Sequence, residues 1–579
     1  KPVSVIEDTA VAPERLPAYM KDCGEMLERL GLQCVYHAHI STGELHLRPV
    51  LNLKDENDRV LFRRVAEETA RLVKKHRGSL SGEHGDGRLR GEFIPLLFGE
   101  KVYGLMQETK VCWDPEGVFN ARKIVNTPPM DTSLRYEVGD SDVACRTYFD
   151  FSKEKGWLCA IEQCNGSGDC RKSYAFGGTM CPSFRATREE SHTTRARANT
   201  LRELITHPRT KKIYDQREIL EVLDTCVSCK ACKSECPSNV DIARFKAEFL
   251  QQHYDVCGVP MKAFLIARLT EIQRLGTILP WFYNAIVRNR MTGNMLKRIL
   301  HFAPKRTIPT LYKTTLKHWL GRYRRKNRGE TVGKVFLFAD EFTNYMDVEI
   351  GIKMIELLDW LGYEVIIPKH VESGRTAISK GMLEVAKGVA RKNVLLLKDL
   401  VTENIPLVGI EPSCILSFRD EYPDLVGEDL KEEAVRLGKN CLLYDEFFTR
   451  EIRAGRIQAE QFTDQPLKIM LHGHCHQKSL ASVEPSREML SLPVNYSVEV
   501  IPSGCCGMAG AFGYEKKHYE LSMKIGEQVL FPAVRGAGEN VCISAPGTSC
   551  RQQIKDGTGK QALHPIEVLY EALKCTKEK

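Results

Sequence analysis

Four cysteines near the middle of the chain have a spacing that suits an iron–sulfur cluster. The run is Cys226-x2-Cys229-x2-Cys232-x3-Cys236, and a proline follows its last cysteine. In ferredoxin-type runs, three such thiolates bind one cubane cluster and the fourth reaches a neighbouring cluster, so this run predicts two clusters. A zinc knuckle is the alternative, but zinc sites use paired C-x2-C units rather than this triple.

A second run lies upstream and has the same layout with one change. It consists of Cys164, Cys170 and Cys181, and Ser167 occupies the middle cysteine position. If each run supplies its last cysteine to the other cluster, Cys181 joins Cys226, Cys229 and Cys232 around a complete 4Fe-4S cluster. The other site then keeps Cys164, Cys170 and Cys236. Three thiolates predict a 3Fe-4S cluster, or a 4Fe-4S cluster whose fourth ligand is Ser167, Asp169, water or Cys159.

Further thiols follow short apolar segments in the last part of the chain. Segments 334–339, 364–368 and 406–410, and again 468–472, 498–502 and 540–544, alternate with helical stretches, which is a βαβ pattern occurring twice. Such a repeat indicates an internal duplication. The thiols at the ends of these segments are candidate ligands of a third cluster: Cys414, Cys475, Cys505, Cys506 and Cys550. The alternative is a metal-free domain that docks an electron acceptor.

Histidines and a carboxylate form another candidate site near the start of the chain. Residues 34–40 and 45–49 alternate apolar and polar side chains, which predicts a β-hairpin with Ser41–Glu44 as its turn. In that register His39 lies directly opposite His46. Downstream, three glycines surround Glu83 and His84 within residues 81–87. Two histidines and a carboxylate suit zinc, iron or manganese with an open position for substrate.

These segments, together with Trp113–Asn120, resemble the C-terminal half of the FAD-linked oxidases, which include D-lactate, glycolate and D-2-hydroxyglutarate dehydrogenases. The resemblance implies that His39, His46 and Glu83 bind a divalent metal, with Zn²⁺ favoured, that His84 is the general base, and that Asn120 lies near the flavin. It also implies FAD, bound mostly by a region preceding residue 1. The turn Ser41–Glu44 departs from the family's usual Gly-Asp-Gly-Asn. On charge grounds, Arg48 and Arg88 are candidates to bind a substrate carboxylate.

The thiols of the last part resemble those of the cysteine-rich CCG domains. Such domains occur in heterodisulfide reductases and in the iron–sulfur subunits of glycolate oxidase and anaerobic glycerol-3-phosphate dehydrogenase. The expected fold class is therefore multidomain, α+β and α/β: an FAD-linked oxidase cap fragment, an α-helical ferredoxin-like cluster domain and a duplicated α/β CCG domain. The expected bounds are 1–135 for the substrate and metal domain, 155–256 for the cluster domain, 257–330 for a basic helical connector, and 331–579 for the duplicated domain (331–450 and 465–579).

Charge is distributed unevenly along this chain of 579 residues. The net charge is +8, and residues 288–328 hold many Lys and Arg side chains but no Asp or Glu. Because this basic segment follows an apolar, aromatic stretch that begins at Trp281, residues 281–328 are candidates for peripheral contact with anionic lipid. A solvated linker, or a basic face docked on the same protein, is the alternative. No apolar run is long enough to span a bilayer. Because the cysteines have metal-binding spacings rather than a disulfide pattern, we expect a reducing, cytoplasmic compartment, with peripheral contact to the inner face of the plasma membrane.

Together with the cysteine patterns, the resemblance to FAD-linked oxidases implies FAD- and iron–sulfur-dependent oxidation of a D-2-hydroxy acid resembling D-lactate. Electrons would pass through the 4Fe-4S clusters to a quinone or a protein acceptor, and nucleic acid is not an expected partner. Two alternatives remain open at this point. One is an electron-transfer subunit without its own flavin. The other is a thiol–disulfide reductase of the heterodisulfide reductase type, using the Cys505 and Cys506 region.

Overall fold

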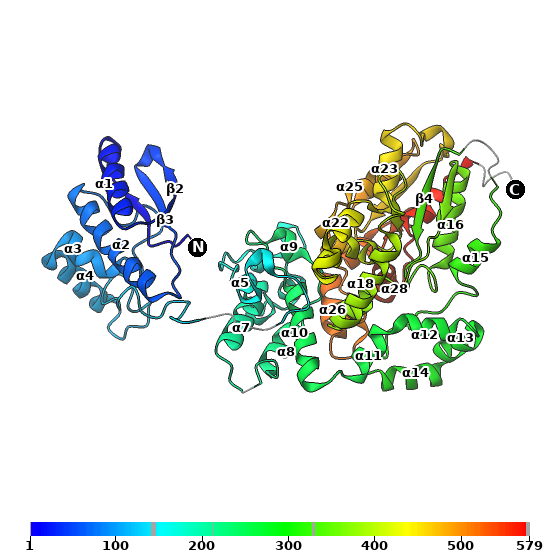
Figure 1. Ribbon diagram of the computed structural model, residues 1–579, viewed down its shortest axis with the longest axis horizontal. Helices are drawn as coiled ribbons and strands as arrows, with labels where there is room; N and C mark the ends of the chain where they lie inside the picture. The colour runs from blue at the N-terminus through cyan, green and yellow to red at the C-terminus, as the bar shows by residue number, and fades with distance from the viewer. Residues whose placement is uncertain (1, 141–145, 211, 327–330, 575–579) are drawn as a thin grey trace. The chain divides into compact units, whose positions relative to one another are not determined.

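The chain forms two compact units, Lys1–Ser141 and Asp142–Lys579, in a computed structural model (Figure 1). The structure describes residues 2–140, 146–210, 212–326 and 331–574. Each unit is described by itself below. Asn327 and Arg328, which belong to the expected basic segment, lie outside the described residues.

The first unit is built on an antiparallel sheet in the order β1-β3-β2. Its strands are β1 (Ile6–Ala10), β2 (Cys34–His39) and β3 (Glu44–Pro49). The central strand β3 is buried along most of its length, and its apolar side chains join helices α1 (Leu16–Arg29) and α2 (Glu56–Lys75) in one hydrophobic core. Asp55 caps α2 by accepting a hydrogen bond from the Asp58 N–H at 3.1 Å. The predicted hairpin is therefore present, on a rigid support.

Short helices dominate the first part of the second unit. They are α5 (Trp157–Ile161), α6 (Pro182–Thr187), α7 (Thr194–Thr206), α8 (Arg217–Asp224), α9 (Ala231–Glu235) and α10 (Ile242–Cys257). Helix α10 corresponds to the helix expected after the central cysteine run, and Asp241 caps it. Its buried side chains Ile242, Phe245 and Phe249 belong to the same hydrophobic cluster as the cysteines. This helix therefore shields the cysteines from water, as the apolar spacing predicted.

Five helices follow in the basic region: α11 (Met261–Ala267), α12 (Leu269–Gly276), α13 (Pro280–Arg288), α14 (Arg290–Ile299) and α15 (Leu316–Arg322). Part of the basic charge is paired within the protein. Arg306 is fully buried, lies 3.1 Å from Asp556 and donates to the Ser522 hydroxyl at 2.8 Å. Within the described ranges, no helix has both the length and the apolar character needed to cross a bilayer.

Two parallel sheets form the last part of the second unit. One has the order β5-β4-β6-β7 and the other β10-β8-β9. Their strands are β4 (Gly333–Phe338), β5 (Tyr363–Ile366), β6 (Leu407–Gly409), β7 (Cys441–Leu443), β8 (Leu467–Leu471), β9 (Tyr496–Val500) and β10 (Val541–Ser544). All six expected strands are present, and β7 is an addition. In both sheets the first strand lies between the second and the third. One hydrophobic cluster contains Leu337 and Leu471 alike, so the two sheets share a core.

Candidate metal and iron–sulfur sites

The hairpin places the first group of candidate ligands, in a register that differs from the expected one. His39 pairs with Glu44, and His46 pairs with His37, because the loop consists of Ile40–Gly43. The predicted direct pairing of His39 with His46 is therefore wrong. The two histidines are diagonal neighbours on one face, and their ring centroids lie 5.1 Å apart. Diagonal neighbours on a hairpin remain within reach of one another when their side chains are long.

Carboxylates from two segments converge on these histidines. Glu83 Oε1 lies 3.7 Å from Nε2 of both His39 and His46, and Glu44 Oε1 lies 3.9 Å from His46 Nε2. The ligand atoms of all four side chains lie within 4.8 Å of one another. Glu44 was not among the residues predicted from the sequence. It stands two residues before His46 on one strand, and that spacing places both side chains on the same face.

The unpaired polar atoms of this group fit a divalent cation. Among the described residues, Glu44 Oε1 and His46 Nδ1 are buried without a hydrogen-bond partner. Burial raises the pKa of Glu44, and the neighbouring Asp8 and Glu83 raise it further. Buried polar atoms and neighbouring negative charges are costly unless they are compensated. Two imidazoles with two carboxylates form a donor set that binds zinc or another transition metal.

Asp8 holds the glycine-rich loop in place beside this group. It sits at a bulge in β1 with φ 85°, and its carboxylate accepts hydrogen bonds from the Glu83 N–H at 3.0 Å, the His84 N–H at 3.1 Å and the Ser81 hydroxyl. Burial raises the pKa of Asp8, but these hydrogen bonds outweigh it and lower the pKa to about 2. Asp8 is therefore a fixed anion.

His84 lies between two carboxylates. Its Nε2 is 3.1 Å from Glu83 Oε1, and its Nδ1 is 3.7 Å from Asp8 Oδ1. The imidazole is about half exposed, so a small molecule can reach it. This arrangement orients the ring for proton transfer. No sequence pattern pointed to Asp8, because it acts on a loop that follows many residues later.

The other expected residues of the first unit lie at the surface or are engaged elsewhere. Asn120 is exposed, with φ 48°, and follows the exposed apolar side chains Val118 and Phe119. Arg48 donates to Glu7, and Arg88 donates to the Thr132 carbonyl oxygen at 2.9 Å. The side chain of Asn120 is therefore accessible to a ligand. Arg48 and Arg88, in contrast, form hydrogen bonds within the protein.

The cysteines of the two ferredoxin-type runs gather in one hydrophobic cluster. Six of them are buried and Cys236 packs against the cluster: Cys164, Cys170, Cys181, Cys226, Cys229, Cys232 and Cys236. Burial raises the pKa of the Cys232 thiol, and among its charged neighbours Cys226 and Cys181 raise it further. Cys181 and Cys164 likewise raise the pKa of Cys170, after burial. Cys181 thus lies near both groups, and the division of ligands between two clusters stays a prediction.

A buried arginine accompanies these thiols. Arg197 is 1% exposed, and its guanidinium donates to Cys181 Sγ at 3.2 Å and to the Thr225 hydroxyl at 2.8 Å. A buried cation requires a compensating charge. Thiolate ligands of an anionic cluster would supply it, so the surroundings of Cys181 fit an iron–sulfur cluster. Arg197 was not predicted from the sequence, because its helix α7 carries no cysteine.

Four cysteines from three segments form a further group. They are Cys475 at the start of α24 (Cys475–Leu480), Cys505 and Cys506 after β9, and Cys550 in α28 (Thr548–Thr558), and each thiol shifts the pKa of the next one in that order. The neighbouring Cys505 thiol lowers the pKa of the Cys475 thiol to about 7 despite burial. The fifth candidate, Cys414, belongs to a third hydrophobic cluster, since Cys475 and Cys505 lie in one cluster and Cys506 and Cys550 in another. Burial raises the pKa of Cys414, and Glu341, Asp340 and Glu411 raise it further.

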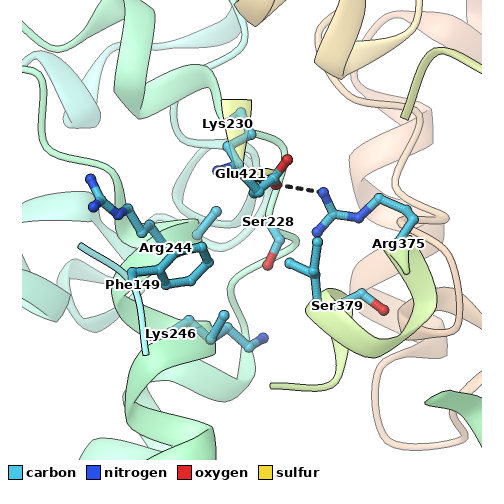
Figure 2. A pocket seen from close by; sticks show the side chains of 11 residues that line it. Phe149, Ser228, Lys230, Arg244, Lys246, Arg375, Ser379 and Glu421 are labelled. Carbon is cyan, nitrogen blue, oxygen red and sulfur yellow. Dashed lines mark hydrogen bonds and ion pairs between the residues drawn. The ribbon is translucent and has the colours of Figure 1, made fainter. Parts of the chain in front are cut away.

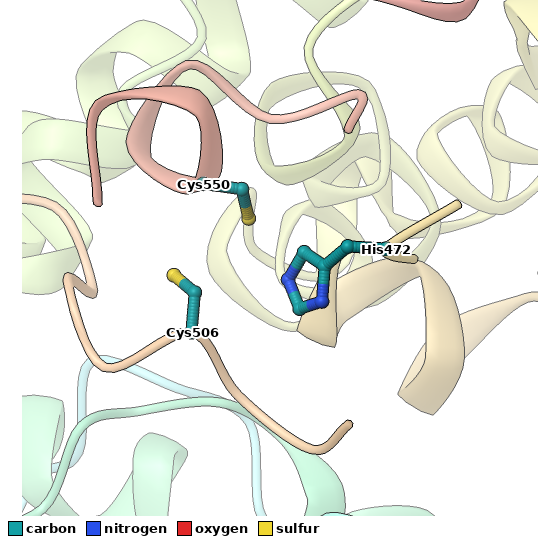
Figure 3. Close-up of side chains that lie close together, drawn as sticks. All are labelled: His472, Cys506 and Cys550. Atoms are coloured by element: carbon teal, nitrogen blue, oxygen red, sulfur yellow. The ribbon is translucent and has the colours of Figure 1, made fainter. Parts of the chain in front are cut away.

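A histidine that was not predicted from the sequence belongs to this group. Ligand atoms of His472, Cys506 and Cys550 lie within 4.8 Å of one another, and all three residues are buried. Figure 3 shows the imidazole facing both sulfur atoms. His472 directly follows β8, at the carboxyl edge of the sheet where α/β folds collect ligands. That position was the signal that could have identified it.

The loop of the central cysteine run rests directly on α24. The Ser479 hydroxyl donates to the Cys229 carbonyl oxygen at 3.1 Å, and His476 Nε2 lies 3.0 Å from the Ser228 carbonyl oxygen. Burial raises the pKa of the Cys229 thiol, and Cys475 is the charged neighbour that raises it most. The two groups of cysteines are therefore adjacent.

A buried ion-pair network strengthens the same contact (Figure 2). Lys230, which stands between Cys229 and Cys232, lies 3.1 Å from Asp241, 2.7 Å from Asp420 and 3.3 Å from Glu421. Arg375 approaches Glu421 at 2.6 Å from the other side. Lys230, Glu421 and Arg375 line a small pocket of about 10 Å³, which leaves no room for a ligand. The ion pairs therefore join the cysteine run to the last part of the chain.

Comparisons with known proteins match two parts of the chain. Residues 1–124 match the family of FAD linked oxidases, C-terminal domain, and residues 163–241 match the 4Fe-4S dicluster domain. The chain is 27% identical to a D-2-hydroxyglutarate dehydrogenase of Escherichia coli over 99% of this chain and 59% of that protein. It is 26% identical to one of the subunits of the anaerobic glycerol-3-phosphate dehydrogenase of Escherichia coli over 58% of this chain and 83% of that protein.

A shorter match covers the first unit. A D-lactate dehydrogenase of Archaeoglobus fulgidus is 28% identical over 22% of this chain and 27% of its own length. The chain spans 59% of the length of the D-2-hydroxyglutarate dehydrogenase that it matches. The expected resemblance is confirmed in its coarse form: the chain joins an FAD-linked oxidase C-terminal domain to a 4Fe-4S dicluster domain and is homologous to D-2-hydroxyglutarate dehydrogenases and to a glycerol-3-phosphate dehydrogenase subunit.

Proposed function

We propose that the protein is an FAD-linked 2-hydroxy-acid dehydrogenase that oxidises a D-2-hydroxy acid resembling D-lactate. The electrons pass through iron–sulfur clusters to a quinone or another acceptor. The observation that carries this proposal is the convergence of His39, Glu44, His46 and Glu83 beside His84, within the domain that matches FAD-linked oxidases.

The side chains of the first unit have distinct roles in this reaction. His39, Glu44, His46 and Glu83 hold the cation, and the exposed edge of the group admits the substrate. His84 Nε2 takes the proton of the substrate hydroxyl, while the Asp8 carboxylate faces Nδ1 and stabilises the resulting imidazolium. When bound, the divalent cation would supply Lewis acidity towards the hydroxyl oxygen, and FAD would supply the hydride acceptor.

The flavin is proposed to contact the surface around Asn120. Helix α4 (Glu100–Trp113) has no buried residue in the first unit, and Trp113 is 83% exposed. Val118 and Phe119 extend this apolar surface up to Asn120. An apolar surface of this kind is typical of an interface. We propose that a region preceding residue 1 covers it and binds most of the FAD.

The second unit is proposed to carry the electrons. Two clusters would use the seven cysteines of the ferredoxin-type runs, with Cys181 and Cys236 exchanged between them as the spacing predicts. A third cluster would use Cys475, Cys505, Cys506 and Cys550. The contact between Ser479 and Cys229 supports direct transfer from the second group to the third. The burial of Cys505 and Cys506 favours ligand roles over disulfide exchange with a large substrate.

The domain bounds expected from the sequence are retained as part of this proposal. The matching strand orders β5-β4-β6 and β9-β8-β10 support a duplication of the CCG type within residues 331–579. The peripheral membrane contact is supported by an exposed apolar surface on α13 and α14, where Trp281 is 68% and Met291 is 83% exposed. Basic side chains next to this surface would attract anionic lipid.

The test is His84→Ala in the intact, flavin-loaded protein. We expect D-2-hydroxy-acid-dependent dye reduction to fall by about 10²–10⁴-fold, because the general base is lost, while iron content stays unchanged. The matched control is His76→Asn, since His76 is engaged with Asp22 at 2.7 Å. Unchanged turnover in His84→Ala would contradict the proposal.

A further inference from the structure

The buried histidine His472 lies beside Cys506 and Cys550. His472 is fully buried, and its Nδ1 lies 2.7 Å from the Ser503 hydroxyl, which fixes the orientation of the ring. Ser503 belongs to the loop that carries Cys505 and Cys506. The same contact therefore positions the imidazole and the loop cysteines relative to one another.

The second ring nitrogen points at the sulfur atoms. Nε2 of His472 is buried and has no hydrogen-bond partner among the described residues. Ligand atoms of His472, Cys506 and Cys550 lie within 4.8 Å of one another, and Figure 3 shows a nitrogen of the ring directed towards both sulfur atoms. Since Ser503 engages Nδ1, this nitrogen is Nε2. A buried nitrogen without a partner, aimed at two thiols, is the arrangement of a metal ligand.

The protein backbone leaves room for this arrangement. A Cβ atom at Gly547 would lie 3.2 Å from Cys550 Sγ and 2.5 Å from Cδ2 of His474. At Gly507, φ is 93°, which only glycine adopts without strain. The segments that carry the ligands therefore approach one another more closely than larger residues would permit.

We propose that His472 Nε2 is a ligand of the third iron–sulfur cluster in place of one of the four thiolates, so that this site has mixed histidine and cysteine coordination. This inference rests on the proposed third cluster and goes beyond it, because it assigns a nitrogen ligand. Ser503 is a positioning residue, which holds Nδ1 and directs Nε2 to the iron. Replacing thiolate by imidazole raises the reduction potential of an iron–sulfur centre. The third cluster is therefore the more oxidising end of the electron path.

The experiment uses the intact protein labelled with [¹⁵N]histidine, so it does not depend on a variant that folds. Pulsed electron paramagnetic resonance is recorded at a series of potentials between full oxidation and full reduction. We expect a strong ¹⁵N coupling from a directly bound imidazole. In His472→Cys the coupling disappears, the iron content stays, and the reduction potential of this cluster falls. In Ser503→Ala the coupling changes while the iron content stays.

The matched control is His564→Asn. His564 is also fully buried in the second unit, with a buried Nε2 that has no partner among the described residues, but its ring lies beside Tyr444. We expect the coupling to persist in this variant. A ¹⁵N coupling that is absent at every potential, or that survives in His472→Cys, overturns the inference.

Metal analysis distinguishes a failure of the proposed third cluster from a failure of the proposed histidine ligand. Iron and sulfide for three clusters without a bound imidazole nitrogen would overturn the inference alone. Iron for only two clusters, or zinc at the third site, would overturn the proposed third cluster and the inference together. An assay of hydroxy-acid oxidation, monitored by dye reduction, tests the first unit independently of the third cluster and of its histidine ligand.

Discussion

Ser479 donates its hydroxyl hydrogen to the carbonyl oxygen of Cys229 at 3.1 Å, although 250 positions separate the two residues. This contact joins the loop of the central cysteine run to the helix that begins with Cys475. Electron transfer between the proposed clusters would require proximity, and this contact lies inside one compact unit. The arrangement of the second unit therefore suits a sequence of clusters.

The buried network around Lys230 is expected to maintain this contact. In Lys230→Met, Asp241, Asp420 and Glu421 lose a shared partner in a site that excludes water. Removing one partner of a buried ion pair costs about 3–5 kcal/mol. Chemical denaturation should show a loss of this size in the free energy of unfolding of the second unit.

Lys172→Met is the control for that measurement. Lys172 is about half exposed and pairs with Asp169 at 2.5 Å. Because exposed pairs contribute about 0–1 kcal/mol, this variant should unfold almost like the parent protein. Equal losses in both variants would show that Lys230 has no special role in docking.

Glu44→Gln tests the metal ligand that sequence patterns did not reveal. The substitution keeps the volume of the side chain but removes the charge that lies beside His46 and Glu83. We expect the affinity for Zn²⁺ to fall by at least about 10–100-fold, which is the loss when a residue that only supports the ligands is replaced. Titration calorimetry against Zn²⁺ measures it. Glu25→Gln, on the exposed side of α1, should bind as the parent does, and unchanged affinity in Glu44→Gln would argue against its role as a ligand.

Acid stability of the first unit should depend on Asp8. The pKa of Asp8 is about 2 in the folded protein, below its ordinary value of 3.8. Its stabilising contribution is therefore present above about pH 4 and is lost as the pH falls from about 4 to about 2. In Asp8→Asn, the free energy of unfolding should be lower at neutral pH and should change less across this window. Denaturation monitored by circular dichroism at each pH gives the free energy of unfolding of the parent protein and of Asp8→Asn. Parallel pH profiles for the two proteins would contradict the assigned pKa of Asp8.

Gly547→Ala should disturb the third site by steric clash, without removing any candidate ligand. The new methyl group would meet His474 Cδ2 at 2.5 Å and Cys550 Sγ at 3.2 Å. We expect iron at the third site to be lost, with iron at the other two retained. The control is Gly536→Ala, because a Cβ at Gly536 meets no atom within 4 Å. Iron and sulfide analysis of both variants after anaerobic purification makes the comparison, and full iron content in Gly547→Ala would count against the crowding described here.

Local spacing in the sequence was sufficient to predict several parts of this protein. The distances between cysteines along the chain identified the ferredoxin-type runs, because one short loop supplies most ligands of a cluster. Alternating polarity predicted the hairpin, because side chains in a strand alternate between two faces. Short apolar segments separated by helical stretches predicted the parallel strands. The histidines and Glu83 were identified in the same way, from a hairpin and a glycine-rich loop.

The tertiary structure alone decided which distant residues complete these sites. Asp8 reaches the loop of Glu83 and His84 across 75 positions, and Arg197 meets Cys181 from a helix without cysteines. His472 joins Cys506 and Cys550 because three separate segments end at one edge of a sheet. A shift of the four-residue loop by one position along the chain changed the partner of His39 from His46 to Glu44. These features follow from long-range packing, which depends on the whole folded chain, whereas spacing along the sequence reports only on near neighbours.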